Sequence, residues 1–492
     1  MVTNDNMFIA FKHKVLEHVA KLAWNDNLDE DHLDRLKYEL IPGPKPVYRC
    51  CIYKEREVVS ERIRLARGKN TIANPDSNNV VQVLQAACDQ CPISTYTVTD
   101  NCRLCLGKAC LSSCQFGAVS IGDKRSHIDP NKCRECGKCA AACPYGVIVH
   151  LVRPCKKVCP VGAISFDENG FCVIDETKCI NCGHCIHSCP FGAISSKTYL
   201  VQIIQAIKSG KKVIAMCAPS IEGQYGEDVT LQSIKNALLK IGFADMVEVG
   251  LGGDIVAASE SAEWSEAKKE GRKMTTSCCP AFISMLKKNY PDQYRENMSE
   301  VVSPMCAVSR YLKYKDPECV TVFIGPCIAK KSETLDKSVK DNADYAITFG
   351  ELRVLLRSKD IEFERTDEQY QESSVWGKRF ASAGGVANAV IQCMKERGED
   401  TSDIKLYKAT GALECKKALA LLKAGRLSED FIEGMACPDG CVGGPSNHRA
   451  PAEIHKAREK LLNNADDRSI LKNLESHPID KFSLLRNEGD TE

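Results

Sequence analysis

Hydrophobic side chains recur at helical spacing near the start of the chain. Six of them lie mostly three or four positions apart, as on one face of a helix: Met7, Phe8, Phe11, Val15, Val19 and Leu22. The sequence Ile41-Pro42-Gly43-Pro44 interrupts this pattern, because proline and glycine break helices. We therefore expect a mostly helical N-terminal region over residues 1–85, in which the basic helix at 61–69 presents a solvated face.

From about residue 197 short apolar runs alternate with amphipathic segments. Residues 212–216 and 320–324 have the pattern of buried strands, whereas 231–239 and 281–289 have the pattern of helices. We therefore expect an α/β domain over residues 197–465. The sequence after residue 465 is polar, and we expect residues 466–492 to form a peripheral C-terminal tail.

Composition narrows the class of protein. With 492 residues the chain is too long for one core, so we expect two or three domains. Sixty-six Lys and Arg against 65 Asp and Glu argue against nucleic acid or a membrane surface as a partner. No apolar run reaches the roughly 18 residues of a membrane span, and the N-terminus lacks the apolar core of a signal peptide. We therefore expect a cytoplasmic protein.

The chain contains 29 cysteines, of which 17 lie between Cys88 and Cys189. Disulfides are rare in the cytoplasm, so thiolate ligation of metal is the expected use. Within this segment the sequence Cys-x-x-Gly, followed by two small or β-branched residues, occurs four times, beginning at Cys114, Cys143, Cys159 and Cys189. Four copies predict tandem bacterial-ferredoxin-like modules over residues 86–196.

The cysteine spacing assigns ligands to four accessory 4Fe–4S clusters. In the bacterial ferredoxin run the fourth cysteine ligates the neighbouring cluster, and the last run obtains its partner from a split motif into which the first two clusters are inserted. Sixteen cysteines then form four sets: Cys102, Cys105, Cys110 and Cys143; Cys133, Cys136, Cys139 and Cys114; Cys179, Cys182, Cys185 and Cys159; and Cys88, Cys91, Cys155 and Cys189.

A zinc site that includes Cys88 and Cys91 stays open as an alternative to the split motif. Structural zinc sites use four thiolates, usually from two Cys-x-x-Cys pairs, and this region supplies one such pair. Three further cysteines are expected to be small buried hydrophobes rather than ligands: Cys172, Cys50 and Cys51.

Three short motifs lie far apart in the C-terminal half. They are Thr276-Ser277-Cys278-Cys279-Pro280, Gly325-Pro326-Cys327-Ile328-Ala329-Lys330-Lys331 and Met435-Ala436-Cys437-Pro438-Asp439-Gly440-Cys441. Each motif places cysteine beside proline or glycine, where a turn can direct a thiolate inward. Four thiolates from three loops can hold one more 4Fe–4S cluster, and Lys330 would add a buried cation beside an anionic ligand.

Together these motifs resemble the active-site domain of the FeFe-hydrogenases. The resemblance implies a two-lobed α/β domain that holds an H-cluster, a 4Fe–4S cluster joined to a diiron unit with CO, cyanide and an azadithiolate. It makes Cys441 the bridge to the diiron unit, and Lys330 and the segment Ala218-Pro219-Ser220 the partners of its cyanides. Met435 would pack near its bridging carbonyl. The implied cluster ligands are Cys279, Cys327, Cys437 and Cys441.

The resemblance also implies a proton path. In the family the thiol at Cys278 passes protons to the azadithiolate amine, and a thiol with an ordinary pKa near ~8.5 suits reversible transfer. Glu260, Glu263 and Ser299 fall where the family places its relay to solvent. The residues alone leave other roles open: solvated helix charges for the glutamates, a helix cap for Ser299 and a core thiol for Cys278.

The chain departs from the family's pattern around the diiron unit. Met305-Cys306 replaces the usual Gln after Ser-Pro, Gly325 replaces Met, and Ala281-Phe282 stands where Trp is usual. In this the chain resembles a less-studied subgroup, often called group B. Cys306 either approaches the site or packs inertly.

The expected activity is 2H⁺ + 2e⁻ ⇌ H₂ at the H-cluster. Electrons would pass through the accessory clusters to or from a soluble ferredoxin or similar carrier, and hydrogenase maturation proteins would be further partners. The alternative is a non-catalytic hydrogenase-like redox or H₂ sensor, or an iron–sulfur assembly protein. Such relatives tend to lose the relay thiol or the lysine motif, and this chain has Cys278 and Lys330.

Overall fold

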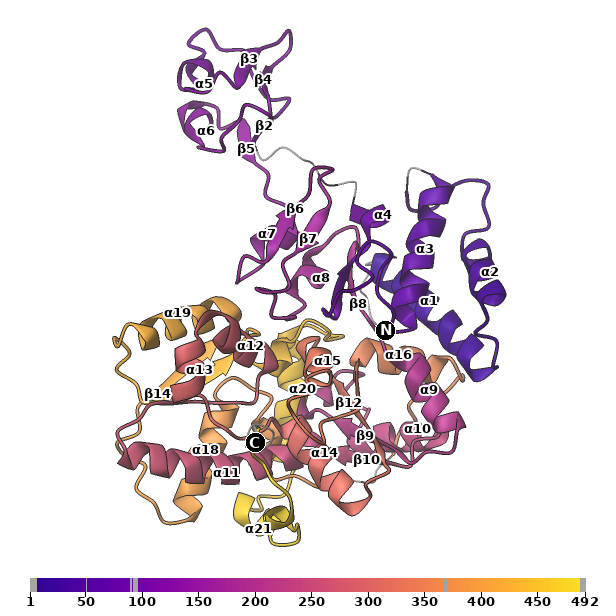
Figure 1. Cartoon of the computed structure of the whole chain (residues 1–492), viewed down its shortest axis with the longest axis vertical. Helices are drawn as coiled ribbons and strands as arrows, with labels where there is room; N and C mark the ends of the chain where they lie inside the picture. Colours follow the sequence, from indigo (N-terminus) through magenta and orange to yellow (C-terminus); the bar gives the residue numbers. More distant parts are fainter. Residues whose placement is uncertain are drawn as a thin grey trace.

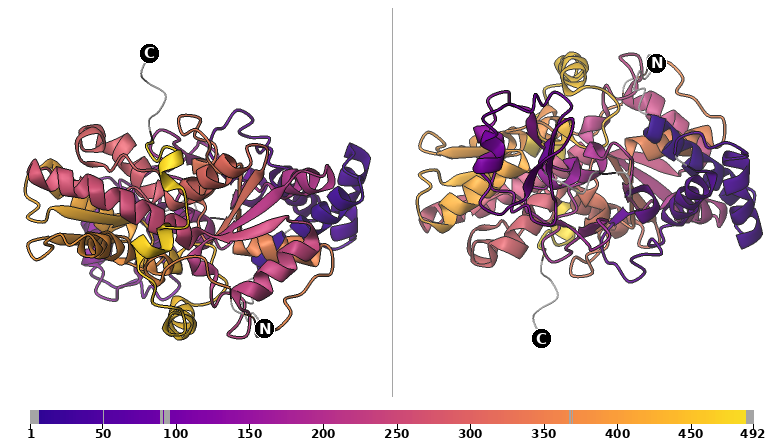
Figure 2. Two further views of the ribbon diagram at one scale, coloured as in Figure 1. Left: turned by 90° about the horizontal axis from the view of Figure 1, so that it is seen from below. Right: turned by 90° about the horizontal axis from the view of Figure 1, so that it is seen from above.

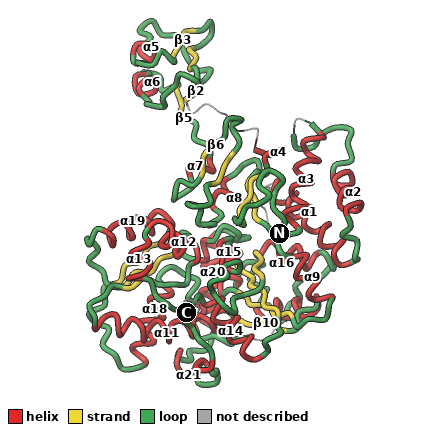
Figure 3. The backbone as a smooth tube through the Cα atoms, viewed as in Figure 1, coloured by secondary structure: helices red, strands yellow, loops and turns green. Residues whose placement is uncertain are grey.

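A computed structural model describes residues 7–49, 51–88, 91, 96–366, 368 and 370–486. Figure 1 shows a large α/β body, a group of helices beside it, and two small cysteine-rich modules that extend away from it. Helices and strands are mixed throughout the body (Figure 3). The α/β multidomain fold expected from the sequence is confirmed. Within the described residues no helix is both long and apolar enough to cross a lipid bilayer.

The N-terminal helices are α1 (Met7–Trp24), α2 (Glu30–Leu40) and α3 (Ile52–Ala66). They lie at one end of the body (Figure 2) and share a hydrophobic core with it. The prediction of a solvated face on α3 is wrong, because one of the cysteine-rich modules and the loop that follows α3 cover it. Arg62 is 5% exposed and donates a hydrogen bond to the carbonyl of Gly192 at 3.0 Å, and Glu61 accepts one from the Ile72 amide at 3.1 Å.

The two cysteine-rich modules are nested. The outer one contains β1 (Val81–Val83), α4 (Gln85–Cys88), α7 (Pro154–Lys157), β6 (Ile164–Phe166), β7 (Cys172–Ile174), α8 (His184–Ser188) and β8 (Ile194–Ser196). The inner one contains β2 (Tyr96–Val98), α5 (Ala109–Ser112), β3 (Val119–Ile121), β4 (Ser126–Ile128), α6 (Lys138–Ala142) and β5 (Ile148–His150). Strand β1 pairs with β8 and β2 pairs with β5, both antiparallel, so in the sequence the inner pair lies between the two strands of the outer pair. Because β1 belongs to the outer module, the cysteine-rich region includes residues before 86, the start expected from the sequence.

The first lobe of the body is a parallel sheet in the order β10-β9-β12-β13. Its strands are β9 (Val213–Cys217), β10 (Asp245–Glu248), β12 (Val320–Gly325) and β13 (Tyr345–Thr348). The helices around it are α9 (Leu200–Lys208), α10 (Leu231–Ile241), α14 (Pro304–Lys315), α15 (Ala329–Glu333) and α16 (Phe349–Arg357). The apolar runs predicted as strands form β9 and β12, and both are buried because helices cover the two faces of the sheet.

The second lobe is a smaller parallel sheet in the order β11-β15-β14. Its strands are β11 (Met274–Thr275), β14 (Leu406–Thr410) and β15 (Phe431–Met435). Helices α11 (Val249–Lys269), α12 (Pro280–Asn289), α13 (Pro291–Asn297), α17 (Val375–Arg379), α18 (Gly385–Glu396) and α19 (Ala412–Lys423) complete the lobe, and α20 (Pro451–Asn463) follows it in the chain. The central helix α11 packs against α14 of the first lobe and α18 of the second.

The segment from residue 466 to Arg486 packs on the body, so the prediction of a peripheral tail is wrong for this part of the chain. Ile470 in α21 (Ile470–Leu474) is fully buried. After the short helix η3 (Ile479–Lys481), the Leu484 carbonyl accepts a hydrogen bond from the Val302 amide at 2.8 Å. Its polar composition misled the prediction, because backbone pairing and a few apolar anchors hold this segment on the body.

Candidate functional site

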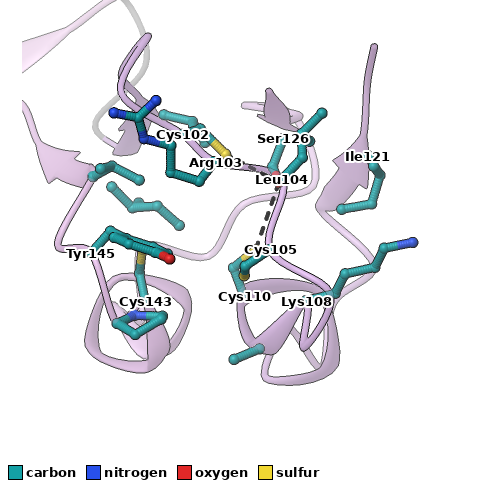
Figure 4. A pocket seen from close by; sticks show the side chains of 15 residues that line it. Cys102, Arg103, Leu104, Cys105, Lys108, Cys110, Ile121, Ser126, Cys143 and Tyr145 are labelled. Carbon is teal, nitrogen blue, oxygen red and sulfur yellow. Dashed lines mark hydrogen bonds between the residues drawn. The ribbon is translucent and has the colours of Figure 1, made fainter. Parts of the chain in front are cut away.

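The inner cysteine-rich module has two pockets, each lined by four thiols. Figure 4 shows the first, where Ser126 Oγ lies 3.7 Å from Cys110 Sγ. The cysteines lining this pocket are Cys102, Cys105, Cys110 and Cys143. Those lining the other are Cys114, Cys133, Cys136 and Cys139. The structure thus groups these eight residues as the ferredoxin spacing predicts, with one thiol of each pocket supplied by the other run.

Each of the four repeats turns on a glycine in the left-handed conformation. The residues are Gly117, Gly146, Gly162 and Gly192, with φ between 59° and 65°. Glycine adopts this conformation without steric cost, and the turn brings the next amide back over the cysteine. The amides of Ala118, Ala163 and Ala193 donate to the sulfurs of Cys114, Cys159 and Cys189 at 3.2–3.4 Å. Such N–H···S bonds are a means of tuning iron–sulfur sites.

The outer module brings cysteines of both predicted sets into one hydrophobic cluster, which contains Cys88, Cys155, Cys159, Cys185 and Cys189. Burial raises the pKa of Cys88 and of Cys91. Electrostatic repulsion from Cys155 and Cys189 raises both pKa values further. Burial likewise raises the pKa of Cys179, Cys182 and Cys185, and electrostatic repulsion from Cys159 adds to each rise. Within the described residues no three His, Cys, Asp or Glu side chains are arranged to hold a single metal ion.

The cysteines expected to be buried hydrophobes differ in their surroundings. Cys172 is 3% exposed, and its amide donates to Cys88 Sγ at 3.3 Å. Cys51 is only half-buried, because it precedes the first turn of α3 at the surface. Cys50 lies outside the described residues.

The three C-terminal motifs meet between the two lobes. Parallel strands present their carboxyl ends at one edge of a sheet, where ligands bind in α/β folds. In the first lobe β9 leads into the short helix η1 (Pro219–Ile221) and β12 leads into Cys327. In the second, β11 leads into Cys279 and β15 into Cys437, and Cys441 opens the short helix η2 (Cys441–Gly443).

These strand ends surround one cavity of about 760 Å³, part of which is open to solvent. Its wall includes every residue that the resemblance places around the H-cluster: Cys278, Cys279, Cys327, Cys437, Cys441, Pro219, Ser220, Lys330 and Met435. The Ser220 hydroxyl is buried there without a hydrogen-bond partner among the described residues. Four thiols, an unpartnered hydroxyl and an ammonium group in apolar walls fit a sulfur-ligated cluster with polar, anionic ligands.

Lys330 brings a positive charge to the cavity wall. Its ammonium donates to the Ser303 hydroxyl at 2.8 Å and to the Glu333 carboxylate at 2.6 Å. Burial alone would lower the pKa of Lys330, but the attraction of Glu333 outweighs burial and raises it. The side chain therefore stays cationic. The Lys-x-x-Glu spacing, one helical turn apart, is the sequence signal that could have revealed Glu333.

A chain of polar groups leads from the cavity toward the surface. The Ser277 amide and hydroxyl, next to Cys278, donate to Glu260 Oε1 at 3.0 and 2.8 Å. Glu260 is fully buried, and its other oxygen has no partner among the described residues. The Ser299 hydroxyl donates to the Glu263 carboxylate at 2.6 Å, and Glu263 is half-buried.

The surroundings of this chain make its carboxyls weak acids. Burial, and after it Glu263, raises the pKa of Glu260 to about 7, while the hydrogen bonds from Ser277 oppose the rise. Burial also raises the pKa of Glu263. Glu260 is therefore not a solvated helix charge. Ser299 is not a helix cap either, because Ser303 caps α14.

The residues that depart from the family's pattern are accommodated by close packing. A Cβ at Gly325 would lie 2.5 Å from the Phe323 ring, which itself lines the cavity. Met305 also lines the cavity, whereas Cys306 is fully buried in the adjacent core and does not. Of the two roles left open for Cys306, the structure favours inert packing.

Arg486 is a contact that the sequence did not reveal. Its guanidinium donates to the Ser277 carbonyl at 3.3 Å, and its amide donates to the Glu300 carbonyl at 2.8 Å. The residue therefore ties the C-terminal segment to both ends of the polar chain. No local pattern near residue 486 indicates this, because the contact joins segments that are far apart in the sequence.

Family models match both the cysteine-rich region and the two-lobed body. The family model described as iron only hydrogenase large subunit, C-terminal domain, matches residues 211–445. A 4Fe-4S binding domain matches residues 125–148, and an LdpA Fe-S cluster-binding domain matches residues 150–200. A variant of the apo [FeFe]-hydrogenase HydA1 from Chlamydomonas reinhardtii is a structural neighbour at 22% identity and a TM-score of 0.48, covering 57% of this chain and 92% of that one.

Relatives by sequence include enzymes and an assembly factor. Iron hydrogenase 1 of Clostridium pasteurianum is 30% identical over 407 residues, 70% of this chain and 70% of that protein. The periplasmic [Fe] hydrogenase large subunit of Nitratidesulfovibrio vulgaris is 30% identical over 51% of this chain and 72% of its own. The cytosolic Fe-S cluster assembly factor NAR1 of Kluyveromyces lactis is 24% identical over 34% of this chain and 50% of its own. The chain, with its iron–sulfur binding domains, therefore belongs to the iron-only hydrogenase family.

Proposed function

We propose that this protein is an FeFe-hydrogenase that interconverts protons, electrons and H₂. The observation that carries the proposal is the continuity of the cavity with the polar chain. Cys278 lines the cavity beside four other thiols, and Ser277 and Glu260 adjoin it. A protein that only stores or senses a cluster needs the thiolates but has no need of a route for protons.

In this proposal Cys279, Cys327, Cys437 and Cys441 would ligate the H-cluster cube, and Cys441 would also hold the diiron unit. Ser220 and Lys330 would donate to its cyanides, and Met435 would pack beside it. When bound, the diiron unit would supply an open iron coordination site and a basic amine, which together make and break the H–H bond. The apolar wall formed by Phe323, Met305 and Phe380 would limit access of water.

The chain's own residues would move the proton. Burial raises the pKa of the Cys278 thiol well above its ordinary value, so Cys278 holds its proton at neutral pH. Its place in the cavity wall is what would let it pass that proton to a basic group bound there. Glu260, with a pKa of about 7, can return a proton to Cys278 at little cost, because its two protonation states are nearly equal in energy there. Ser299 and Glu263 would complete the route to solvent.

The four accessory cysteine sets would carry electrons. The charge of Cys182 in the outer module acts on Cys437 of the cavity, and that of Cys155 acts on Cys185, so the two outer sets and the main cavity lie close to one another. A soluble ferredoxin or similar carrier would exchange electrons with this series. Hydrogenase maturation proteins would install the diiron unit.

The test combines spectroscopy with turnover on the matured protein. We expect infrared bands of metal-bound CO and CN⁻ together with H₂ evolution from a reduced viologen. Intact diiron bands without turnover would favour a sensor. A cubane without any CO or CN⁻ band, after maturation under conditions that load a known hydrogenase, would favour an assembly protein.

Metal analysis tests the cluster count. Each cubane holds four irons, so five cubanes and one diiron unit predict about 22 iron atoms per chain. An iron content of about 14 atoms per chain would mean that the outer module holds no 4Fe–4S cluster. One zinc per chain, lost in a Cys91→Ser variant, would instead assign Cys88 and Cys91 to a zinc site.

A further inference from the structure

A second cavity lies where the N-terminal helices, the outer cysteine-rich module and the first lobe meet. Its empty volume is about 1520 Å³, including its opening to solvent. Helix α1 and Arg62 of α3 form one wall, and α16 with the loop at 445–448 forms another. The third wall comes from the outer module, at Gly183, His187 and Gly192. No part of the proposed hydrogenase chemistry uses this cavity.

Two glycines in these walls let other side chains pack directly against the backbone. A Cβ at Gly192 would lie 2.7 Å from the Phe8 ring and 2.9 Å from the Arg62 guanidinium. A Cβ at Gly350 would lie 2.8 Å from His13 Nε2. The basic groups are therefore set into a packed junction of three parts of the chain rather than scattered over an open surface.

The side chains that line this cavity are strongly unbalanced in charge. Five of them are Lys or Arg: Lys12, Lys14, Arg62, Arg353 and Arg357. The one carboxylate among them, Glu17, already accepts a hydrogen bond from Lys21 at 2.8 Å. The buried carboxylate nearby, Glu351, is engaged with Lys331 at 2.6 Å and also attracts Lys12. Five cationic side chains thus face two carboxylates that are already paired with other lysines, and the cavity keeps a positive charge.

Several of these groups lack partners. Arg62 Nε and His448 Nε2 are buried and unpaired in the described part of the chain. Lys12 forms no hydrogen bond or close ion pair with any residue that the structure describes, and burial lowers its pKa to about 8. Burying cationic and polar groups without partners is unfavourable, so these groups are arranged for a ligand that supplies negative charge and acceptor atoms.

We propose that this cavity binds a small polyanion, whose phosphate or carboxylate oxygens are held by Lys12, Arg62 and Arg353. Guanidinium groups match the geometry of both oxyanions, and Lys12 adds a point charge. The volume exceeds what a single phosphate ion needs, which favours a molecule with several anionic groups. The site adjoins Gly183, between Cys182 and Cys185, and Ile328, next to Cys327, so a bound anion would lie beside the route between the outer module and the main cavity.

Calorimetric titration of the full-length protein at fixed ionic strength tests the proposal. The probes are sodium tripolyphosphate and citrate, and we expect saturable binding of at least one of them at one site per chain. Tighter binding of tripolyphosphate would identify a phosphate ligand, and tighter binding of citrate a carboxylate ligand. Each lost charged contact is expected to weaken binding about tenfold or more.

Arg353→Gln and Arg62→Met are the informative variants. Arg353 is only half-buried, so its replacement leaves the fold intact even if Arg62→Met does not fold. Lys359→Gln is the matched control, because Lys359 follows the same helix and loses the same charge but packs on Trp24 outside the cavity. Absence of saturable binding of both probes, or equal weakening by Lys359→Gln and Arg353→Gln, would overturn the proposal. The readout is binding, so it is independent of hydrogenase activity.

Discussion

Replacing Cys278 with alanine should lower the rate of H₂ evolution by about two to four orders of magnitude, the range that a positioned proton donor contributes. Cys278 lies in the wall of the main cavity between Ser277, which bonds to Glu260, and the proposed ligand Cys279. Alanine keeps the backbone and removes the only proton-bearing atom of this side chain. Among the described titratable side chains of the cavity wall, only Cys278 directly follows Ser277, the residue that bonds to Glu260.

The loss should come from proton transfer rather than from failure to hold the cofactor. We therefore expect the infrared bands of CO and CN⁻ in Cys278→Ala to be nearly those of the parent protein, because the four proposed ligands are unchanged. Cys278→Ser is expected to be almost as slow, since a hydroxyl is a far weaker acid than a thiol.

Cys306→Ala is the matched control. Cys306 is also a buried thiol close to the main cavity, but it packs in the core and does not line the cavity wall. Its replacement should leave turnover near that of the parent at the small cost in stability of a minor core truncation. Unchanged turnover in Cys278→Ala, or an equal loss in both variants, would remove the proton role from Cys278.

The cysteine groupings were the part most readily predicted from sequence, because cluster ligation imposes short spacings between residues. The split pairing of Cys88 and Cys91 with Cys155 follows from the same arithmetic, since one half-motif was left over, and it stays a prediction. The strand end that carries Cys327 was also visible as the apolar run at 320–324 followed by glycine and proline. These features are local, and local features survive in a sequence read alone.

Long-range packing decides what could not be predicted. Arg62 has the pattern of a solvated helix residue, but the outer module covers it and leaves its Nε unpaired in the described part of the chain. The polar segment after residue 465 is held by backbone pairing beside Val302, for which no side-chain pattern exists. The Phe323 ring occupies the space that a side chain at position 325 would need. Only the three-dimensional contact reveals this.

Glu260→Gln is the second variant with a large expected effect, because it should lower activity and raise stability together. Gln cannot carry a proton between Cys278 and Ser299, so turnover should fall by about two orders of magnitude or more. The amide fits the site: its oxygen can accept the two hydrogen bonds from Ser277, and its NH₂ group replaces the oxygen that has no partner among the described residues.

The stability effect follows from the raised pKa of Glu260. Below its ordinary value of 4.5 the carboxyl is protonated in both folded and unfolded chains, so it contributes no difference. Between 4.5 and about 7 the unfolded chain has released the proton that the folded chain retains, so the free energy of unfolding falls as the pH rises. Above about pH 7 the full penalty is present, on the order of 3 kcal/mol for this buried group.

Glutamine does not titrate, so Glu260→Gln escapes this penalty. The variant should unfold at nearly the same temperature as the parent at pH 4.5, and at a higher temperature at pH 8, in thermal scans at one rate. Glu266→Gln makes the same change at an exposed position of α11 and should show no such growth with pH, because this side chain is solvated in both the folded and the unfolded chain. A parent protein more stable than Glu260→Gln at pH 8 would mean that Glu260 is ionised and satisfied in the folded state. Such a carboxylate would hold its proton too weakly to return it to Cys278, so the same measurement bears on the proton route.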